Sequence, residues 1–372
     1  MQTERKMYQG NAKWVGGAQF GDEGKGIVSA HLARLFQAKI VAKTGVGPNA
    51  EHGFFLEDET TYLKVNQLPL GWILNPQTQI RIGRNVAIDP DKLQKEMKLY
   101  KLDGRVKIDP NCPIITAEHI RQETESKRMR SELGSTMSGS GYAHADHILR
   151  VGPVARDIDS LSPLLVDVSE ELNRISQTET VILESSQGYG LSLSTEYYPN
   201  TTSKNVTSSA AMDDTGLNPF RLSDVFLVVK TMPTREGGGS MGQVNELSLE
   251  EIKRRNLTEI SSIEGKIRRK AHSIDFEMLK TASEVNGATQ IVLTFCEQYD
   301  PELRNATKRG QVTKKVWALI EKIQETTDVP VTILNTGKPY YSFIYLPDSN
   351  IDMSAVRQET DLSSLKPSPT SL

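Results

Sequence analysis

The chain has 372 residues, of which 24% are charged and 37% hydrophobic, and its formal net charge is −3 at pH 7. Because there is no basic excess, nucleic acid is not an expected partner. Two cysteines, Cys112 and Cys296, are too few for a disulfide framework or a metal framework. No apolar run reaches the roughly 20 residues of a membrane span, and residues 1–13 lack the apolar core of a signal peptide. These features predict a cytoplasmic protein without a membrane partner.

Short apolar runs alternate with longer segments of helical periodicity along the chain. The apolar runs that predict buried strands are 40–43, 79–82, 180–183, 225–229 and 290–293. The segments that predict helices are 27–36, 91–100, 169–175, 248–255, 276–285 and 314–326. This alternation predicts an α/β fold with a large, mostly parallel central sheet flanked by helices. Residues 1–350 are expected to form a single catalytic domain with inserted substrate loops, and 351–372 a polar C-terminal tail.

The segment 21–26 reads Gly-Asp-Glu-Gly-Lys-Gly and follows a short apolar run at 14–18. A predicted helix comes directly after it, so glycines, a helix N-terminus and Lys25 together favour phosphate binding. A standard P-loop would have Ser or Thr after the lysine to hold Mg2+, whereas this chain has Gly26. Asp22 inside the loop is a candidate metal ligand, general base or both. The alternative is a glycine-rich turn with a solvated acidic pair.

Further segments carry residue types suited to ligand binding, and each is ambiguous when taken alone. His52 lies in a glycine-bounded loop, where a structural histidine is the simpler interpretation. Segment 134–141 interleaves hydroxyls with glycines, which predicts an oxyanion cradle or a flexible linker. Segments 184–188 and 198–205 are polar and turn-rich. The segment 265–270 contains four cations in five residues, typical of a binding loop for a small dicarboxylate or of a solvated basic face.

Taken together and in order, these segments resemble the motifs of the adenylosuccinate synthetase family over about residues 14–338. Segment 19–27 resembles the family's Gln-Trp-Gly-Asp-Glu-Gly-Lys-Gly-Lys, and 49–53 resembles its Asn-Ala-Gly-His-Thr loop. Segments 134–141, 184–188, 198–205, 230–237 and 335–337 match later motifs, with Arg150 at the expected spacing. The resemblance implies an adenylosuccinate synthetase-like fold, which is related to the P-loop NTPases.

The resemblance also implies a two-step ligation of aspartate to a purine mononucleotide. A base removes the N1 proton while a γ-phosphate moves to the 6-oxygen, and the amine of aspartate then displaces that phosphate. By position, Asp22 would be the base and a Mg2+ ligand, and the carbonyl of Glu51 a second Mg2+ ligand. His52 would stabilise the transferred phosphate, and Lys25 would hold phosphoryl oxygens. One loop needs both a carboxylate and a phosphate cradle because the two steps meet at adjacent purine atoms.

Three substrates and a homodimer follow from the same resemblance. The mononucleotide would contact Asn49, Ser135, Thr136, Gln187, Thr202 and Arg235, with Arg150 reaching it across the dimer interface. The nucleoside triphosphate would contact Gly24, Lys25, Gly26, Gly53, Phe295, Glu297, Asn335 and Gly337. L-Aspartate would contact Gly265, Lys266, Arg268 and Arg269.

Several positions depart from the family pattern. Where the family reads the guanine of GTP with a Lys-x-Asp motif, segment 294–297 is Thr-Phe-Cys-Glu, and Phe295 offers a stacking surface for a different base such as adenine. Glu51 and Gly53 replace glycine and threonine beside the catalytic histidine, and 137–138 lacks the cations usual there. These departures resemble the bacteriophage 2-aminoadenylosuccinate synthetases, which join aspartate to dGMP on the route to 2-aminoadenine DNA and can use ATP or dATP.

This branch implies the product N6-succino-2-amino-2'-deoxyadenylate and, for a phage-encoded chain, the host cytoplasm as its location. The alternatives are an ordinary adenylosuccinate synthetase that uses IMP and GTP, and a non-catalytic nucleotide-binding protein. A P-loop kinase or GTPase would share the opening loop, but not the loop with Asn49 and His52 or the late basic loop. The sequence leaves open which mononucleotide binds and which cations of the basic loop grip aspartate.

Overall fold

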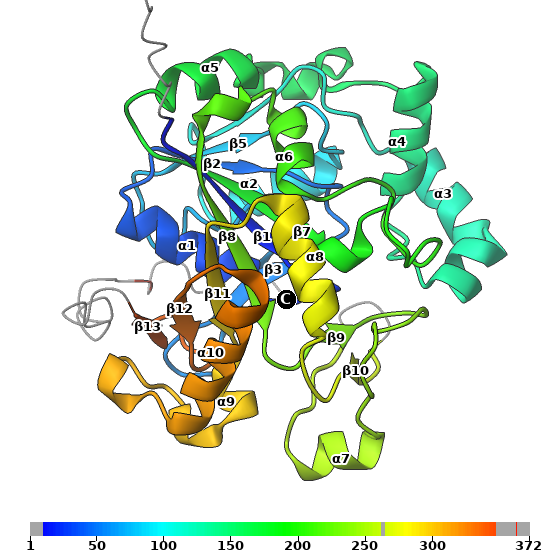
Figure 1. Ribbon diagram of the computed structural model, residues 1–372. Coiled ribbons are helices and arrows are strands. Elements are labelled where there is room, and N and C mark those ends of the chain that lie inside the picture. The colour runs from blue at the N-terminus through cyan, green and yellow to red at the C-terminus, as the bar shows by residue number, and fades with distance from the viewer. Residues whose placement is uncertain (1–9, 262–264, 347–361, 363–372) are drawn as a thin grey trace, which may run out of the picture.

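The computed structural model describes residues 10–261, 265–346 and 362. Within these residues, nine strands form a central sheet in the order β13-β12-β11-β8-β1-β7-β2-β5-β6, and only β13 pairs antiparallel. The strands are β1 (Ala12–Gly17), β2 (Ile40–Lys43), β5 (Gln79–Ile82), β6 (Val106–Ile108), β7 (Val181–Gly188), β8 (Leu222–Lys230), β11 (Gln290–Thr294), β12 (Val331–Asn335) and β13 (Phe343–Tyr345). The predicted mostly parallel sheet is confirmed (Figure 1).

Helices lie along both faces of this sheet (Figure 1). They are α1 (Lys25–Leu35), α2 (Pro90–Leu99), α3 (Ala117–Glu125), α4 (Ser140–Leu149), α5 (Val168–Ile175), α6 (Ser208–Thr215), α7 (Leu249–Arg254), α8 (Phe276–Asn286), α9 (Cys296–Tyr299) and α10 (Lys314–Thr327). The predicted helices correspond to α1, α2, α5, α7, α8 and α10, with ends that agree within two residues. N-cap side chains fix several starts: Asp89 accepts backbone N–H groups of α2, and Thr313 does so for α10.

Strand β8 shows how the sheet divides the core. Phe226 and Val228 pack in a cluster with α1 and α2, whereas Val225, Leu227 and Val229 pack in a second cluster with α5, α6, α8 and α10. Because successive side chains of a strand point to opposite faces, a continuous apolar run is expected when both faces are covered. The near-continuous apolar strands of this sequence therefore reflect two cores.

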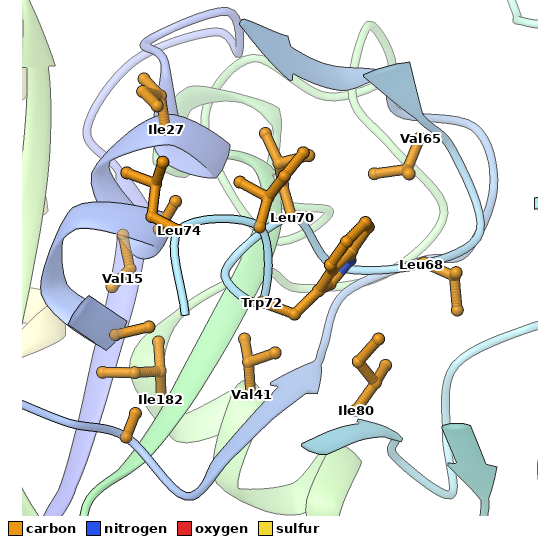
Figure 2. Close-up of a cluster of buried hydrophobic side chains, with 14 of the residues drawn as sticks. Val15, Ile27, Val41, Val65, Leu68, Leu70, Trp72, Leu74, Ile80 and Ile182 are labelled. Carbon is orange, nitrogen blue, oxygen red and sulfur yellow. The ribbon is translucent and has the colours of Figure 1, made fainter. Parts of the chain in front are cut away.

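The first cluster also anchors the segment that follows the small strand β4 (Tyr62–Val65). Figure 2 shows Leu70 and Trp72 from this segment lying over Val41 and Ile80 of the sheet. Trp72 is 2% exposed, and its indole N–H donates to the carbonyl of Pro69 at 2.9 Å. This packing fixes the backbone of the segment close to the carboxyl end of β7, where it meets the site.

Two short antiparallel pairs lie outside the central sheet. Strand β3 (His52–Phe55) pairs with β4, and β9 (Thr234–Arg235) pairs with β10 (Arg269–Lys270). Arg269 lies opposite Arg235 in the second pair. This pairing brings the basic segment 265–270 beside the end of β8. The pairing of β9 with β10 was not predicted.

Leu362 alone is described within the predicted C-terminal tail, 351–372, and the rest of that tail lies outside the described residues. The side chain of Leu362 is 8% exposed and belongs to the first core cluster. The first core cluster therefore includes a residue from beyond position 350.

Candidate active site

The predicted site residues come from loops at one edge of the central sheet. Strands β12, β11, β8, β1, β7 and β2 are neighbours, and their carboxyl ends meet along this edge. The segments that follow or end these strands are 336–337, 295–298, 231–235, 18–24, 184–188 and 44–51. In open α/β sheets, ligands bind outside the carboxyl ends of the strands. The topology therefore gathers residues that are far apart in sequence into one candidate site.

The opening loop between β1 and α1 is built around the buried carboxylate of Glu23. One of its oxygens accepts the N–H groups of Gln19 at 3.1 Å and Gly21 at 3.0 Å, and the other lies 2.5 Å from Nζ of Lys25. Gly21 and Gly24 have φ values of 90° and 82°, which glycine adopts without strain. Helix α1 begins without a side-chain cap, which leaves the N–H groups of its first turn for an anion. The loop has the geometry of a phosphate cradle.

Asp22 lies within this loop, and its side chain is 28% exposed. Its Oδ2 lies 2.8 Å from Nη1 of Arg268, whose Nη2 lies 2.7 Å from Oε1 of Glu236. Burial raises the pKa of the Asp22 carboxyl, and the positive charges of Arg268 and Lys230 act in the opposite direction. A partly accessible carboxylate with a raised pKa is suited to accept a proton from a substrate.

His52, at the start of β3, forms a buried pair with Glu184 of β7. Its Nδ1 lies 2.6 Å from Oε1 of Glu184, and the two carboxylate oxygens of Glu184 also accept the N–H groups of Leu70 and Gly71 at 2.8–3.0 Å. Burial and the nearby Lys43 ammonium lower the pKa of His52 to about 4, so the ring is neutral near pH 7. Glu184 thereby fixes the ring and leaves Nε2 for a ligand.

On the side predicted for the mononucleotide, Gln187 donates from Nε2 to Oδ1 of Asn49 at 3.1 Å. The Oε1 atom of Gln187 is buried and has no hydrogen-bond partner in the described part of the chain. Arg235 is 1% exposed, stacks 4.4 Å from the Phe20 ring centroid and donates to the carbonyl of Asn200. Burial lowers the pKa of Arg235 to about 10. The structure thus joins Asn49 with Gln187, while Arg235 is held by protein groups.

The glycine- and hydroxyl-rich loop 134–141 is organised by another buried carboxylate. Glu123 of α3 accepts the hydroxyl of Ser135 and the N–H of Gly139. Thr136 donates from its hydroxyl to Ser138 at 3.1 Å. The Ser135 hydroxyl therefore already donates to a carboxylate, whereas the Thr136 hydroxyl donates only to another hydroxyl. Of the two predicted ligands, Thr136 has the weaker hydrogen bond within the protein. Thr202 is half-buried, with its backbone N–H bonded to the carbonyl of Leu191 at 2.8 Å.

Phe295, predicted to face the base of the nucleoside triphosphate, lies next to the opening loop. A side chain placed on Gly24 would sit 3.6 Å from the Phe295 ring. Nζ of Lys230 lies 4.3 Å from the centroid of the Phe295 ring and makes a cation–π contact with it. Gly26 and Gly53 also flank this region, since a side chain on Gly26 would meet His52 at 2.9 Å. Donor-side glycines, Phe295 and His52 are therefore close in space.

Asn335 and Glu297 complete the predicted donor side. The Oδ1 atom of Asn335 accepts the N–H of Phe295 at 3.4 Å, and its Nδ2 donates to the carbonyl of Gly337 at 3.0 Å. Oε2 of Glu297 is buried without a hydrogen-bond partner among the described residues. Burial raises the pKa of Glu297 to about 7. Asn335 therefore links the segment after β11 to the segment after β12, whereas the Oε2 atom of Glu297 is available to a ligand.

The cations of the basic segment 265–270 contact different partners. Arg268 reaches the opening loop at Asp22, whereas Arg269 turns to Glu246, with its Nε 2.9 Å from Oε2 of that carboxylate. Lys270 is fully buried. Gly265 and Lys266 are exposed, and 262–264 lie outside the described residues. Of the predicted aspartate ligands, Arg268 contacts Asp22, whereas Arg269 lies opposite Arg235 and is paired with Glu246.

Arg150 lies at the C-terminal end of α4 and is exposed. Within the described residues, its side chain forms no hydrogen bond or ion pair. The neighbouring Ile148, Leu149 and Val151 are 76%, 67% and 72% exposed. A cluster of exposed aliphatic side chains around an arginine is typical of a surface that a partner covers.

A Mg2+ ion is implied by the family resemblance, and the residues present fit it. Mg2+ prefers oxygen ligands and is usually held by one or two carboxylates together with substrate phosphates. Asp22 offers such a carboxylate beside the phosphate cradle. Within the described ranges, no group of three or more His, Cys, Asp or Glu side chains could hold a metal by itself. The side chain of Glu51 pairs with Lys64 at 3.0 Å, and its backbone carbonyl stays the predicted second ligand.

Comparison with known proteins identifies the family. A family model described as adenylosuccinate synthetase matches residues 14–160 and 154–301. The adenylosuccinate synthetase of Thermococcus onnurineus is 37% identical over 327 residues, which cover 87% of this chain and 95% of that protein. The chain belongs to the adenylosuccinate synthetase family. The Methanocaldococcus jannaschii enzyme is also similar, with 36% identity over 334 residues, covering 89% of this chain and 95% of the relative.

Solved structures of two adenylosuccinate synthetase-like enzymes share the fold. The Plasmodium falciparum adenylosuccinate synthetase gives a TM-score of 0.80 at 19% identity, covering 91% of this chain and all of that one. The cyanophage S-2L succinoaminodeoxyadenylate synthetase, bound to dGMP and dATP, gives 0.75 at 24% identity, covering 94% and 99%. These likenesses establish the fold. As an adenylosuccinate synthetase-family member, the protein is a ligase that forms a C–N bond between aspartate and a purine nucleotide.

Several residues of this adenylosuccinate synthetase-like site were missed by the sequence-based prediction. Glu184 and Lys230 are the first residues of two segments that resemble family motifs. Their positions therefore indicated that they belong to the site, but no role was predicted for them. Glu23 was visible only as half of an acidic pair. Glu123 had no signal at all, because a carboxylate that organises a loop is recognised only from its partners. In the described part of the chain, no helix has the length and apolar character needed to cross a membrane.

Proposed function

We propose that this ligase joins L-aspartate to the 6-position of dGMP with ATP or dATP as phosphoryl donor. The γ-phosphate of the donor is transferred to the 6-oxygen of the purine, and the amine of aspartate then displaces that phosphate. The products are N6-succino-2-amino-2'-deoxyadenylate, the nucleoside diphosphate and inorganic phosphate. The reaction would take place in the cytoplasm, which is that of the host if the chain is phage-encoded.

The chain's own side chains supply distinct parts of this chemistry. Asp22 accepts the N1 proton of the purine, for which its raised pKa is favourable. Lys25 and the N-terminus of α1 hold phosphoryl oxygens. His52 is oriented by Glu184, and its Nε2 donates to the transferred phosphoryl group once the negative charge of that group has caused the ring to take up a proton. Arg268 supplies a guanidinium fork to a carboxylate of aspartate.

Mg2+ would be held by Asp22 and the carbonyl of Glu51, and when bound it neutralises charge on the phosphates of the donor. Arg268 occupies Oδ2 of Asp22 in the structure described here, at 2.8 Å. A ligand set with a single protein carboxylate suits Mg2+ because the phosphates provide the remaining oxygens.

The observation that carries the choice of donor is the segment after β11. The Phe295 ring lies beside Gly24, and Nζ of Lys230 lies 4.3 Å from its centroid. The lysine and aspartate with which the family reads guanine are replaced by Phe295 and Glu297. An aromatic face stacks on adenine as readily as on guanine, and the unpartnered Oε2 of Glu297 is an acceptor for an exocyclic amine. An adenine donor therefore fits this segment.

The choice of dGMP as acceptor rests on the departures from the family pattern around His52 and in the loop 134–141. These departures resemble the bacteriophage branch, and the cyanophage S-2L enzyme has been solved with dGMP and dATP bound. That enzyme supports the proposal only as a protein of the same fold.

A second candidate function is an ordinary adenylosuccinate synthetase reaction with IMP and GTP. It is favoured by the curated relatives, which are archaeal enzymes of that name at 36–37% identity over nearly the whole chain. Both candidates use the same catalytic residues and differ only in the two nucleotides. The donor and the acceptor can therefore be tested in one assay.

A homodimer is part of the proposal. Arg150 stands among Ile148, Leu149 and Val151, all of them highly exposed. A second copy that covers these side chains would place Arg150 against the mononucleotide site of its partner. The exposed surface supports this arrangement, because an arginine among aliphatic side chains is common at interface centres.

The test is a phosphate-release assay with aspartate and Mg2+, in which IMP, GMP and dGMP are each combined with GTP, ATP and dATP. Turnover with dGMP and an adenine donor is the expected result. Turnover confined to IMP with GTP would overturn the proposal in favour of the second candidate. Nucleotide binding without turnover in any combination would indicate a non-catalytic binding protein.

A further inference from the structure

Glu259 lies in the segment between α7 and β10, and no substrate contact is assigned to it above. Its side chain is 18% exposed. Its Oε2 lies 2.6 Å from Nζ of Lys230, and its Oε1 lies 2.5 Å from Nζ of Lys270. The same Oε1 accepts Nε2 of Gln298 at 3.1 Å, and Oε1 of Gln298 in turn accepts Nζ of Lys270 at 2.6 Å. One carboxylate therefore contacts three side chains.

The partners of Glu259 belong to three separate elements. Lys230 ends β8, Lys270 belongs to β10, and Gln298 belongs to α9. Both lysines are fully buried. Burial alone would raise the pKa of Glu259, but the two ammonium groups hold it well below its usual range, so the carboxylate is ionised. Glu259 is thus a carboxylate that both buried cations contact directly.

Two of these elements carry donor-site groups. Lys230 stands over the ring of Phe295, and α9 begins directly after Phe295 and includes Glu297. The position of Gln298 therefore helps to set the position of Phe295 and Glu297. Through Lys230 and Gln298, Glu259 holds the groups proposed to face the donor base.

The third contact leads to the aspartate site. The backbone N–H of Arg268 donates to the backbone carbonyl of Glu259 at 2.9 Å, and Lys270 follows two residues after Arg268. Glu259 thus holds the segment 268–270, from which Arg268 reaches Asp22. Donor-side and aspartate-side elements meet at Glu259.

We propose that Glu259 is a positioning residue that aligns Phe295 and Arg268 together and thereby couples binding of the donor to binding of aspartate. The identity of these two ligands rests on the proposed function. Glu259 itself touches neither ligand. A carboxylate that only neutralised two buried lysines would affect folding, but it would not make one affinity depend on the other ligand.

Calorimetric binding tests this directly, because it needs no turnover. The affinity for aspartate is measured with dGMP and Mg2+, with and without a non-hydrolysable ATP analogue. In the parent chain the analogue should tighten aspartate binding by about 5-fold or more, a typical coupling between linked sites. In Glu259→Gln the tightening should disappear, while the affinity for dGMP changes less than about 2-fold.

Asp224→Asn is the matched control. Asp224 pairs with Lys13 and lies near the start of β8, at the opposite end of the strand from Lys230. This variant also removes a lysine-paired carboxylate, but the tightening by the ATP analogue should persist. Loss of coupling in both variants would indicate general loosening and would overturn the assignment.

Gln298→Leu keeps the proposal testable if Glu259→Gln does not fold, since it leaves both lysines paired with Glu259. It removes only the link to α9, so coupling should again be lost. Unchanged coupling in Gln298→Leu, or no coupling in the parent chain, would overturn the proposal. Failure of the proposed function would look different, because the phosphate-release assay of the parent chain would then show no turnover with dGMP and an adenine donor.

Discussion

The imidazole of His52 is held by Glu184, with 2.6 Å between Nδ1 and Oε1. The same carboxylate accepts two backbone N–H groups from the segment that Trp72 anchors in the core. The ring therefore has one orientation, with Nδ1 toward the sheet and Nε2 free to face a ligand. A residue of the strand β7 thus sets the geometry of a proposed catalytic group at the start of β3.

Glu184→Gln should lower kcat by roughly 10- to 100-fold, because a neutral amide holds the imidazole by a weaker hydrogen bond than the carboxylate and orients the ring poorly. The KM for the mononucleotide should change less than about 2-fold. Steady-state kinetics of Glu184→Gln, His52→Gln and the double variant make the test. Since both residues act through one ring, the double variant should be no slower than His52→Gln, and multiplying effects would contradict the pairing.

Asp22→Asn should abolish ligation while the mononucleotide still binds. The amide has almost the shape of the carboxylate but cannot accept the N1 proton, so kcat should fall by at least about 100-fold. Turnover by phosphate release and binding by calorimetry separate the two effects. Near-parental turnover would remove Asp22 from the role of base.

Arg268→Gln and Arg269→Gln should behave differently although the residues are adjacent. Arg268 reaches Asp22, whereas Arg269 is held by Glu246 and the carbonyls of Gly237 and Gly239. Loss of a charged hydrogen-bond donor to a carboxylate should raise the KM for aspartate roughly 10-fold in Arg268→Gln. Arg269→Gln should raise it less than about 3-fold, and the reverse order would show that the segment shifts when aspartate binds.

His31 should make the protein less stable in acid. It is 2% exposed, contacts the carbonyl of Tyr340 and stacks on Phe343, and burial lowers its pKa to about 4. The unfolded chain therefore takes up its proton first, so stability falls as the pH drops from about 6.5 toward 4. At pH 5 this one group costs roughly 2 kcal/mol.

Urea unfolding of the parent chain and His31→Gln at pH 7 and pH 5 measures this contribution. The variant should lose less unfolding free energy between the two pH values, by roughly 2 kcal/mol. An equal loss in both proteins would show that His31 does not titrate in this range.

Arg150→Leu should raise the KM for the mononucleotide without lowering kcat to the same degree, if the arginine acts across a dimer. Sedimentation of the parent chain should show a dimer, and Ile148→Asp should weaken it because a charge would be buried in the interface. A monomeric parent with an unchanged KM in Arg150→Leu would contradict the composite site.

The fold class and most helices could be predicted because the apolar pattern records burial directly. The runs at 225–229 and 290–293 are buried on both faces, and that is why they read as continuous apolar strands. The pairs β3–β4 and β9–β10 were missed. Their strands have four residues in the first pair and two polar residues in the second, so the pattern is too brief to show a period.

The parts of the site that could be predicted are those where the backbone conformation requires a particular residue type. The glycines at positions 21 and 24 record left-handed turns, and Lys25 follows them at the start of α1. The partners of these residues could not be predicted. Glu123 lies 12 residues before Ser135, and Glu184 lies 132 residues after His52, so only the folded chain reveals that they touch.

Convergence of loops at the carboxyl edge of the sheet has an evolutionary consequence. The groups proposed to perform proton and phosphoryl transfer follow β1 and β2, whereas those proposed to face the donor base follow β11. These segments are encoded far apart and meet only through folding. Substitutions after β11 can therefore change the side chains that face the donor base while the residues Asp22 and Lys25 themselves are retained. Lineages of such ligases can exchange one energy-supplying nucleotide for another while the reaction itself is inherited unchanged.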